Sequence, residues 1–258
     1  MAILKNRLPL AVFASLALVS FVQVASGAST LTECSGNDHK TWNACYGQAS
    51  EDGHSYIGQW EDGKPNGHGV LFVSDGDVYT GGFRNGDFHG YGVYVFVSGG
   101  SYAGEFEGNL FTGIGTLSAP DRFKYVGEFK DDEFNGQGTI TYSDGNKYTG
   151  EFKDGEMHGK GTFTRPDGSL YIGTMRDGKP HGRGFLSHGE VGVTYRGDLV
   201  DGNFHGQGEL TFPDGRKYVG EFHEGERHGD GVEYSKDGAV SKEGNWVEGD
   251  FQLALKKI

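Results

Sequence analysis

A tyrosine that returns at a nearly constant interval constrains the fold more than any other feature of the sequence. Successive copies are 23 residues apart, except for 24 residues between the sixth and the seventh, and the tyrosines are Tyr56, Tyr79, Tyr102, Tyr125, Tyr148, Tyr171, Tyr195 and Tyr218. Two residues after each tyrosine stands a glycine. Two residues further on stands a large apolar residue, in order Trp60, Phe83, Phe106, Phe129, Phe152, Met175, Leu199 and Phe222. This period-two alternation predicts a β-strand with all three positions on one face.

The rest of each copy predicts a turn and a second strand. In the fifth copy the turn runs from Lys153 to Gly159, and Gly155 and Gly159 suit the positive φ angles that tight turns need. The second strand then carries one inward apolar residue per copy, namely Leu71, Tyr94, Leu117, Ile140, Phe163, Leu186 and Leu210. The copy closes on a turn tripeptide such as Pro166-Asp167-Gly168. Each copy is therefore predicted to be a β-hairpin.

Hairpins of this kind need neighbours, because a single two-stranded hairpin is marginally stable at best. Stacked copies bury a continuous aromatic face, and glycines such as Gly150 and Gly161 leave space for rings to lie over the backbone. We therefore predict an all-β fold, an elongated, twisted, single-layer sheet of tandem hairpins. At ~4.8 Å per strand the array would be on the order of 80 Å long.

The frame Y-x-G-x-[FW]-x-x-G-x-x-[HN]-G-x-G resembles that of the MORN repeat family, over roughly residues 56–250. The copies that begin at Tyr56, Tyr148 and Tyr171 fit nearly every position. The copies at Tyr102 and Tyr125 fit the frame less well in the turn, where Asn109 and Asp132 replace glycine. The resemblance implies a role in protein assembly, frequently with self-association, and a disputed link to membranes.

Residues 1–26 are typical of a secretory signal peptide, with Lys5 and Arg7 before an apolar run and a small-residue cleavage site at Val24-Ala25-Ser26. An uncleaved anchor is the alternative, but the run is short for a spanning helix of ~20 residues. We therefore expect a secreted or periplasmic protein. Its division would be 1–26 signal peptide, 27–55 N-terminal cap, 56–241 eight repeats, and 242–258 a partial repeat with the C-terminal cap.

Cys34 and Cys45 are the only cysteines, and in an exported chain they predict a disulfide within the N-terminal cap. Free thiols or a shared metal suit an oxidising compartment less well. The stretch from Trp42 to Gly47 also resembles the lead-in of exported bacterial MORN proteins. We expect the cap to cover apolar residues that the first two copies place on the face opposite the tyrosines, namely Val70, Phe72, Val93, Val95 and Val97.

Charge and motifs exclude several classes of function. The net charge is −13, and cleavage after the signal would make it −15, which disfavours nucleic acid and anionic lipid as partners. The sequence has no nucleophile elbow, P-loop or dinucleotide fingerprint. The stretch from His223 to His228 is one residue too long for the zinc motif HExxH and falls in a turn. We predict no enzyme activity, no catalytic residues, no metal site and no cofactor, although weak calcium binding at the Asp-Gly turns is left open.

Two further rows of polar residues recur with the frame. One turn position is histidine in five copies and asparagine in two, which we attribute to a need for turn geometry; its histidines are His89, His158, His181, His205 and His228. An acidic residue lies between the strand glycine and the aromatic residue in five copies, namely Glu105, Glu128, Glu151, Asp198 and Glu221. We interpret this row as a solvated face with cross-strand pairing, and a polar ligand groove is the alternative.

Three functions fit these features. The first is an exported scaffold that binds protein partners, or a second copy of itself as a homodimer, through the repeat face. The second is a glycan-binding or cell-wall-binding module that uses the aromatic rows, and it requires rings open to solvent. The third is binding to a phospholipid surface, which the acidic charge disfavours.

Overall fold

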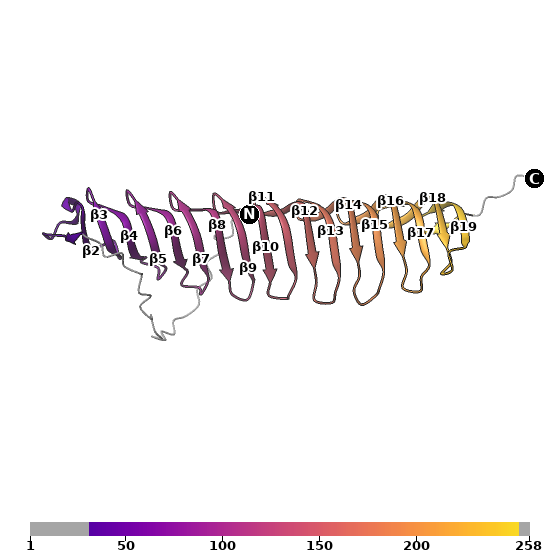
Figure 1. The fold of residues 1–258 in the computed structure, drawn as a ribbon, viewed down its shortest axis with the longest axis horizontal. Helices are drawn as coiled ribbons and strands as arrows, with labels where there is room; N and C mark the ends of the chain where they lie inside the picture. The colour runs from indigo at the N-terminus through magenta and orange to yellow at the C-terminus, as the bar shows by residue number, and fades with distance from the viewer. Residues whose placement is uncertain (1–30, 253–258) are drawn as a thin grey trace, which may run out of the picture.

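The computed structural model describes residues 31–252, which form one sheet of 20 strands (Figure 1). From β2 to β20 each strand pairs antiparallel with the next strand of the chain, and β1 pairs parallel with β2. The predicted all-β, single-layer array of hairpins is confirmed. The strands are β1 (Thr32–Glu33), β2 (Cys45–Glu51), β3 (His54–Glu61), β4 (Lys64–Phe72), β5 (Val78–Arg84), β6 (Asp87–Val95), β7 (Ser101–Glu107), β8 (Leu110–Ala119), β9 (Phe123–Lys130), β10 (Glu133–Tyr142), β11 (Lys147–Lys153), β12 (Glu156–Thr164), β13 (Leu170–Arg176), β14 (Lys179–Ser187), β15 (Thr194–Val200), β16 (Asn203–Thr211), β17 (Lys217–His223), β18 (Glu226–Tyr234), β19 (Val240–Val247) and β20 (Asp250–Phe251).

The predicted signal peptide, residues 1–26, lies outside the described residues. Among residues 31–252 we find no helix with the length and apolar character needed to cross a membrane. The one helical element there that precedes the array is a short 3-10 helix, η1 (His39–Thr41).

Each hairpin turns through two residues with positive φ, the geometry that matches the right-handed twist of the flanking strands. In the fifth copy these residues are Asp154 at 49° and Gly155 at 81°. Asn109 and Asp132 also adopt positive φ, at 71° and 69°. The two copies that depart from the frame in sequence therefore keep the positive φ of the turn, because asparagine and aspartate tolerate the left-handed conformation.

The same turn residue connects each copy to the one before it. The N–H of Gly155 donates to the carbonyl of Phe134 at 3.0 Å, and the N–H of Asn109 and of Asp132 make the equivalent bonds to the preceding copy. The two non-glycine residues add a second bond, because the Asn109 side chain accepts the N–H of Phe88 at 2.8 Å. These bonds join neighbouring copies at the turn edge, beyond the end of the strand ladder.

The hairpin of each of the eight copies also contains a β-bulge, a point where one strand has extra residues relative to its partner. In β11 and β12 the register is regular up to the pair Gly150–Gly161 and then shifts, so that Glu151 pairs with His158. Gly159 lies within the bulge and has a φ of 56°. The corresponding glycines of neighbouring strands pair directly with one another throughout the array, as Gly161 does with Gly173.

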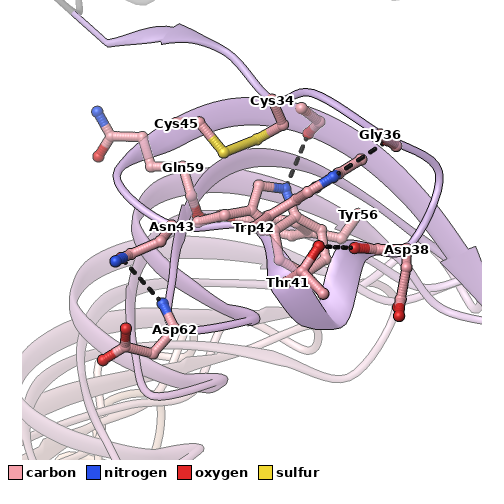
Figure 2. The surroundings of a disulfide bond; sticks show 12 residues. Cys34, Gly36, Asp38, Thr41, Trp42, Asn43, Cys45, Tyr56, Gln59 and Asp62 are labelled. Atoms are coloured by element: carbon pink, nitrogen blue, oxygen red, sulfur yellow. Dashed lines mark hydrogen bonds between the residues drawn. A yellow bond between two sulfur atoms is a disulfide. The ribbon is translucent and has the colours of Figure 1, made fainter.

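The segment from Cys34 to Cys45, which a disulfide bond closes, covers the N-terminal end of the array (Figure 2). Cys34 and Cys45 form the predicted disulfide, with an S–S distance of 2.07 Å. Trp42 packs edge-on against Trp60 with ring centroids 5.2 Å apart, and its indole N–H donates to the Gly36 carbonyl at 3.2 Å. This described part of the cap therefore covers the end of the aromatic row.

The cap does not cover the apolar residues on the opposite face. Phe72 and Val95 remain 45% exposed, and Val97 remains 70% exposed. The expectation that the cap would shield them was wrong for the described residues, because Trp42 packs on the tyrosine side of the sheet and β1 pairs with the outer edge of β2.

The C-terminal end is closed by a charged cluster on top of the aromatic row. Lys242 occupies the tyrosine position of the partial ninth copy, and its amino group lies 5.6 Å from the centroid of the Trp246 ring. Arg227 lies 4.1 Å from the same centroid and pairs with Glu233 at 2.9 Å. The aromatic stack thus ends in cation–π contacts together with one last ring, Phe251 of β20, whose centroid lies 5.2 Å from that of Trp246.

Candidate interaction surface

We call the face that carries the eight tyrosines the ring face, and the opposite face the second face. On the ring face the tyrosines are 0–4% exposed, although residues 31–252 form a single sheet with no second layer. The aromatic residues of the same row are buried equally well, at 2–5%, and they are Trp60, Phe83, Phe106, Phe129, Phe152 and Phe222. The residues predicted as a repeat aromatic face therefore form the hydrophobic core of the molecule.

The tyrosine ring is held by the glycines beneath it and by the bulge beside it. A Cβ at Gly150 or Gly161 would lie inside contact distance of the Tyr148 ring, so only glycine leaves room for it. The Tyr148 hydroxyl donates to the carbonyls of Glu151 and His158, at 3.1 Å each. Burial raises the pKa of Tyr148 to about 12, and the nearby Glu151 carboxylate adds to the shift.

The ring is covered from outside by a residue that the sequence analysis did not single out. In four copies a phenylalanine from the second strand stacks flat on the tyrosine, with centroids 3.8–3.9 Å apart, in the pairs Tyr79–Phe88, Tyr102–Phe111, Tyr125–Phe134 and Tyr195–Phe204. Other copies place Pro65, Met157, Pro180 or Arg227 at this position. The signal was present in the sequence, since this residue always follows the strand's large apolar residue by five positions.

The recurring acidic residues serve the bulge. The Glu128 carboxylate accepts the N–H of Gln137 at 2.8 Å, and Glu151 accepts the N–H of Lys160 at 3.0 Å. Glu105 and Asp198 make the equivalent bonds at 3.3 Å. The row is therefore a set of side-chain caps for N–H groups that the bulge removes from the strand ladder, a role that we did not expect. The cross-strand pairing that we expected is present at Asp198, which lies 3.5 Å from its cross-strand partner Arg183.

The recurring histidines lie in the second strands and are absent from the residues with positive φ. The turn geometry that we expected for this position was therefore wrong. Near the C-terminal end three imidazoles approach one another, His205 to His223 at 5.3 Å and His223 to His228 at 5.5 Å between centroids. Within residues 31–252 no group of three or more His, Cys, Asp or Glu side chains is arranged to hold a metal ion.

Comparison with protein families matches the MORN repeat to eight segments, which together span more than half of the chain and are residues 56–78, 79–101, 102–122, 125–147, 148–170, 171–188, 195–215 and 218–240. The chain belongs to the MORN repeat family. All eight segments begin at a tyrosine whose ring lies over a pair of glycines in the structure. The MORN frame of this protein is thus the set of residues that builds the hairpin and its ring stack.

No curated protein matches the sequence. Among solved structures, a mutant TCP10 domain of CPAP from Danio rerio is similar, with 15% identity, a TM-score of 0.37, and coverage of 77% of this chain and 99% of that chain. The TCP domain of SAS-4 (dCPAP) from Drosophila melanogaster, in complex with a proline-rich motif of Ana2 (dSTIL), has 12% identity, a TM-score of 0.30, and coverage of 70% and 85%. Both are distant from this MORN array.

The second face of the MORN array carries one long uncharged row. Each tyrosine is followed by a residue that points to this face, and cross-strand pairing joins these residues into a continuous ladder. From β3 to β14 the ladder contains no charged residue, and its members are Ile57, Val70, Thr80, Val93, Ala103, Thr116, Val126, Thr139, Thr149, Thr162, Ile172 and Phe185. None of them is buried.

We call these twelve residues the uncharged ladder. Val126 is 45% exposed and Ile172 is 48% exposed, and Tyr91 and Ile114 beside the ladder are each 66% exposed. A chain with a net charge of −13 thus has a long strip of its surface without charge. Such a strip is typical of an interaction surface, because exposed apolar residues that lie together gain free energy when another surface covers them.

Proposed function

We propose that this protein is an exported, non-enzymatic MORN-repeat scaffold that binds protein partners, or a second copy of itself, through the second face. The observation that supports it is the uncharged ladder. Twelve strands at ~4.8 Å span ~53 Å, and the ladder together with one flanking row of side chains, which includes charged residues such as Glu105 and Lys160, has an area of roughly 700 Å². A stable protein–protein interface buries about 800 Å² on each partner, so the ladder with its flanking row has the right size.

The ring face supports no competing function. Stacking on a sugar needs an aromatic ring with an open side, and the tyrosines of this protein are covered by glycine on one side and by the stacked residue on the other. The glycan hypothesis therefore loses the surface on which it depended. Binding to an anionic phospholipid surface is disfavoured by the net charge of −13.

Export is part of the proposal, and two features support it. The N-terminal residues have the pattern of a secretory signal, and the structure contains a disulfide, which persists in oxidising compartments. Fractionation of cells that express the full chain tests this part, and recovery of the uncleaved chain in the cytoplasm would contradict it.

Binding is tested by affinity capture from the exported fraction with the tagged mature chain, together with sedimentation velocity of that chain alone. A lysine in the middle of the ladder, Val126→Lys, should abolish capture or self-association, because it buries a charge in the interface. Asn203→Lys makes the same change of charge at an exposed hairpin end and is the matched control. Equal loss in both variants, or a monomer that captures nothing, would refute the proposal.

A further inference from the structure

The second face is hollowed where five strands, β13 to β17, lie side by side. The hollow has a volume of about 830 Å³, within the range of ligand-binding sites. Its lining includes Ile172, Arg183, Phe185, Arg196, Gln207 and Val219. It lies where the uncharged ladder ends, since Arg196 is the residue that follows Phe185 in the cross-strand row.

The Arg196 guanidinium is available to a ligand. It lies 5.5 Å from the centroid of the Phe185 ring, a cation–π contact that holds it over the hollow. Its cross-strand partner, Glu209, is engaged by the Lys217 amino group at 3.3 Å instead. Among residues 31–252 no carboxylate lies within ion-pair distance of Arg196.

Within the described residues, the Arg183 guanidinium makes one ion pair, through its Nε atom. Its Nε lies 3.5 Å from an Asp198 carboxylate oxygen, and its side chain is 84% exposed. Asp198 is itself fixed, because its carboxylate caps the bulge through the N–H of Gln207. Arg183 thus contacts Asp198 through Nε, and its exposed guanidinium has further N–H donors that can bind a second carboxylate.

Apart from Gln207, the other side chains in the lining are apolar. Ile172, Phe185 and Val219 belong to the same cross-strand row, and Ile172 is 48% exposed. A ligand that satisfies this site needs both anionic groups, for the two arginines, and apolar groups, for the three other side chains. Four gaps between five strands give a length of ~19 Å, which an extended peptide of about six residues spans.

We propose that this hollow binds an extended, acidic segment of a partner protein, in which Glu or Asp alternates with apolar residues. The proposal rests on the proposed function and names the chemistry of the partner at one place on the second face. Carboxylates accept paired hydrogen bonds from Arg183 and Arg196, and the apolar side chains of the segment pack on Ile172 and Phe185. A protein segment is favoured over an anionic membrane because the net charge of −13 opposes approach to an extended anionic surface, whereas a short segment is small enough to contact Arg183 and Arg196, which lie beside Asp198 and Glu209.

The test uses a fluorescein-labelled peptide of eight residues that alternates glutamate and valine, titrated with the mature chain at ~0.15 M salt and followed by fluorescence anisotropy. The double variant Arg183→Gln with Arg196→Gln should weaken binding at least tenfold. Arg84→Gln with Arg122→Gln removes the same charge from distant exposed positions and should change binding less than twofold. A serine–glutamate peptide should bind several-fold more weakly than the valine–glutamate peptide.

Each other outcome overturns the proposal. If the glutamate–valine peptide does not bind, or if the distant double variant weakens it as much as the hollow variant, the hollow is not a peptide site. If vesicles of phosphatidylglycerol bind and compete with the peptide through the same arginines, the ligand is a lipid surface. Capture of a partner that still depends on Val126 and not on Arg183 and Arg196 would leave the proposed function standing and refute only this assignment. Circular dichroism of each variant confirms that the sheet is intact.

Discussion

A methyl group at Gly161 should destabilise the array by displacing the Tyr148 ring. A Cβ built at Gly161 overlaps two carbons of that ring and its hydroxyl oxygen, all well inside contact distance. The ring cannot move aside cheaply, because it is 0% exposed and its hydroxyl donates to two carbonyls of the bulge. We therefore expect Gly161→Ala to cost about 3 kcal/mol, the order of a large aromatic side chain lost from a core less the usual gain of alanine over glycine in a strand.

The mechanism is tested by removing the ring. Tyr148→Ala alone should cost ~3–5 kcal/mol, and adding Gly161→Ala to it should cost nothing more, because the methyl group then occupies vacated space. The two substitutions should thus be coupled by about 3 kcal/mol. Gly155→Ala in the same copy is the matched control: its φ of 81° strains alanine, but open space surrounds the added methyl group, so it should show no coupling to Tyr148.

The free energies come from urea denaturation followed by circular dichroism, with amide hydrogen exchange on β11 and β12 to detect local opening of one copy, since repeat arrays need not unfold as one unit. Additive effects of Gly161→Ala and Tyr148→Ala, within ~0.5 kcal/mol, would refute the account of the ring over the glycine. So would a Gly161→Ala protein as stable as the wild type.

Four smaller predictions follow from the same geometry. Tyr148→Phe should lower the free energy of unfolding by ~1–3 kcal/mol, because the carbonyls of Glu151 and His158 lose their donor; no change in urea denaturation would contradict it. Burial raises the pKa of Tyr148 to about 12, from about 10 in the unfolded chain, so its contribution to the free energy of unfolding should be complete below pH 10 and lost as the pH rises from 10 to 12. Unfolding and tyrosinate absorbance should then rise together, and ionisation of all tyrosines at pH 10 without unfolding would contradict this. Replacing Cys34 and Cys45 with serine should cost roughly 2–3 kcal/mol, and hydrogen exchange should confine the loss to the cap and β2. Asn109→Ala should cost about 1–2 kcal/mol in the same assay, because its left-handed φ and its bond to Phe88 are both lost, whereas Asn203→Ala, at an exposed hairpin end, should cost almost nothing.

The hairpin and its ring face were predictable because they depend on local alternation. Tyr148, Gly150 and Phe152 share a face in any extended strand, so the period alone places them together. The residue that covers the ring was missed because it comes from the other strand, across the bulge. The register shift after Gly150 brings Met157 opposite Phe152, and a count of alternating positions along one strand does not contain that shift.

The acidic row shows a second limit of sequence reasoning. An acidic residue beside an aromatic strand position looks like part of a solvated face, and Glu151 does point to the second face. Its role follows from the N–H of Lys160, which the bulge leaves without a ladder partner. The hollow at Arg183 and Arg196 was missed for a similar reason, since its lining comes from five strands and is contiguous only in the sheet.

The features that sequence reasoning missed have one physical origin, which also indicates where a partner binds. The residues that recur along the array are used by the fold: tyrosine and glycine build the stack in all eight copies, an acidic residue caps the bulge in four copies, and the turn residue bonds to the preceding copy. The residues that discriminate between binding partners are therefore those that differ from one copy to the next. On the second face the row after the tyrosine changes from Val126 through Thr149 and Ile172 to Arg196 while the frame beneath it stays constant. Selection for a partner can thus alter this row copy by copy without disturbing the core, which is why the uncharged ladder and the arginine hollow, rather than the MORN frame, are the surfaces to mutate.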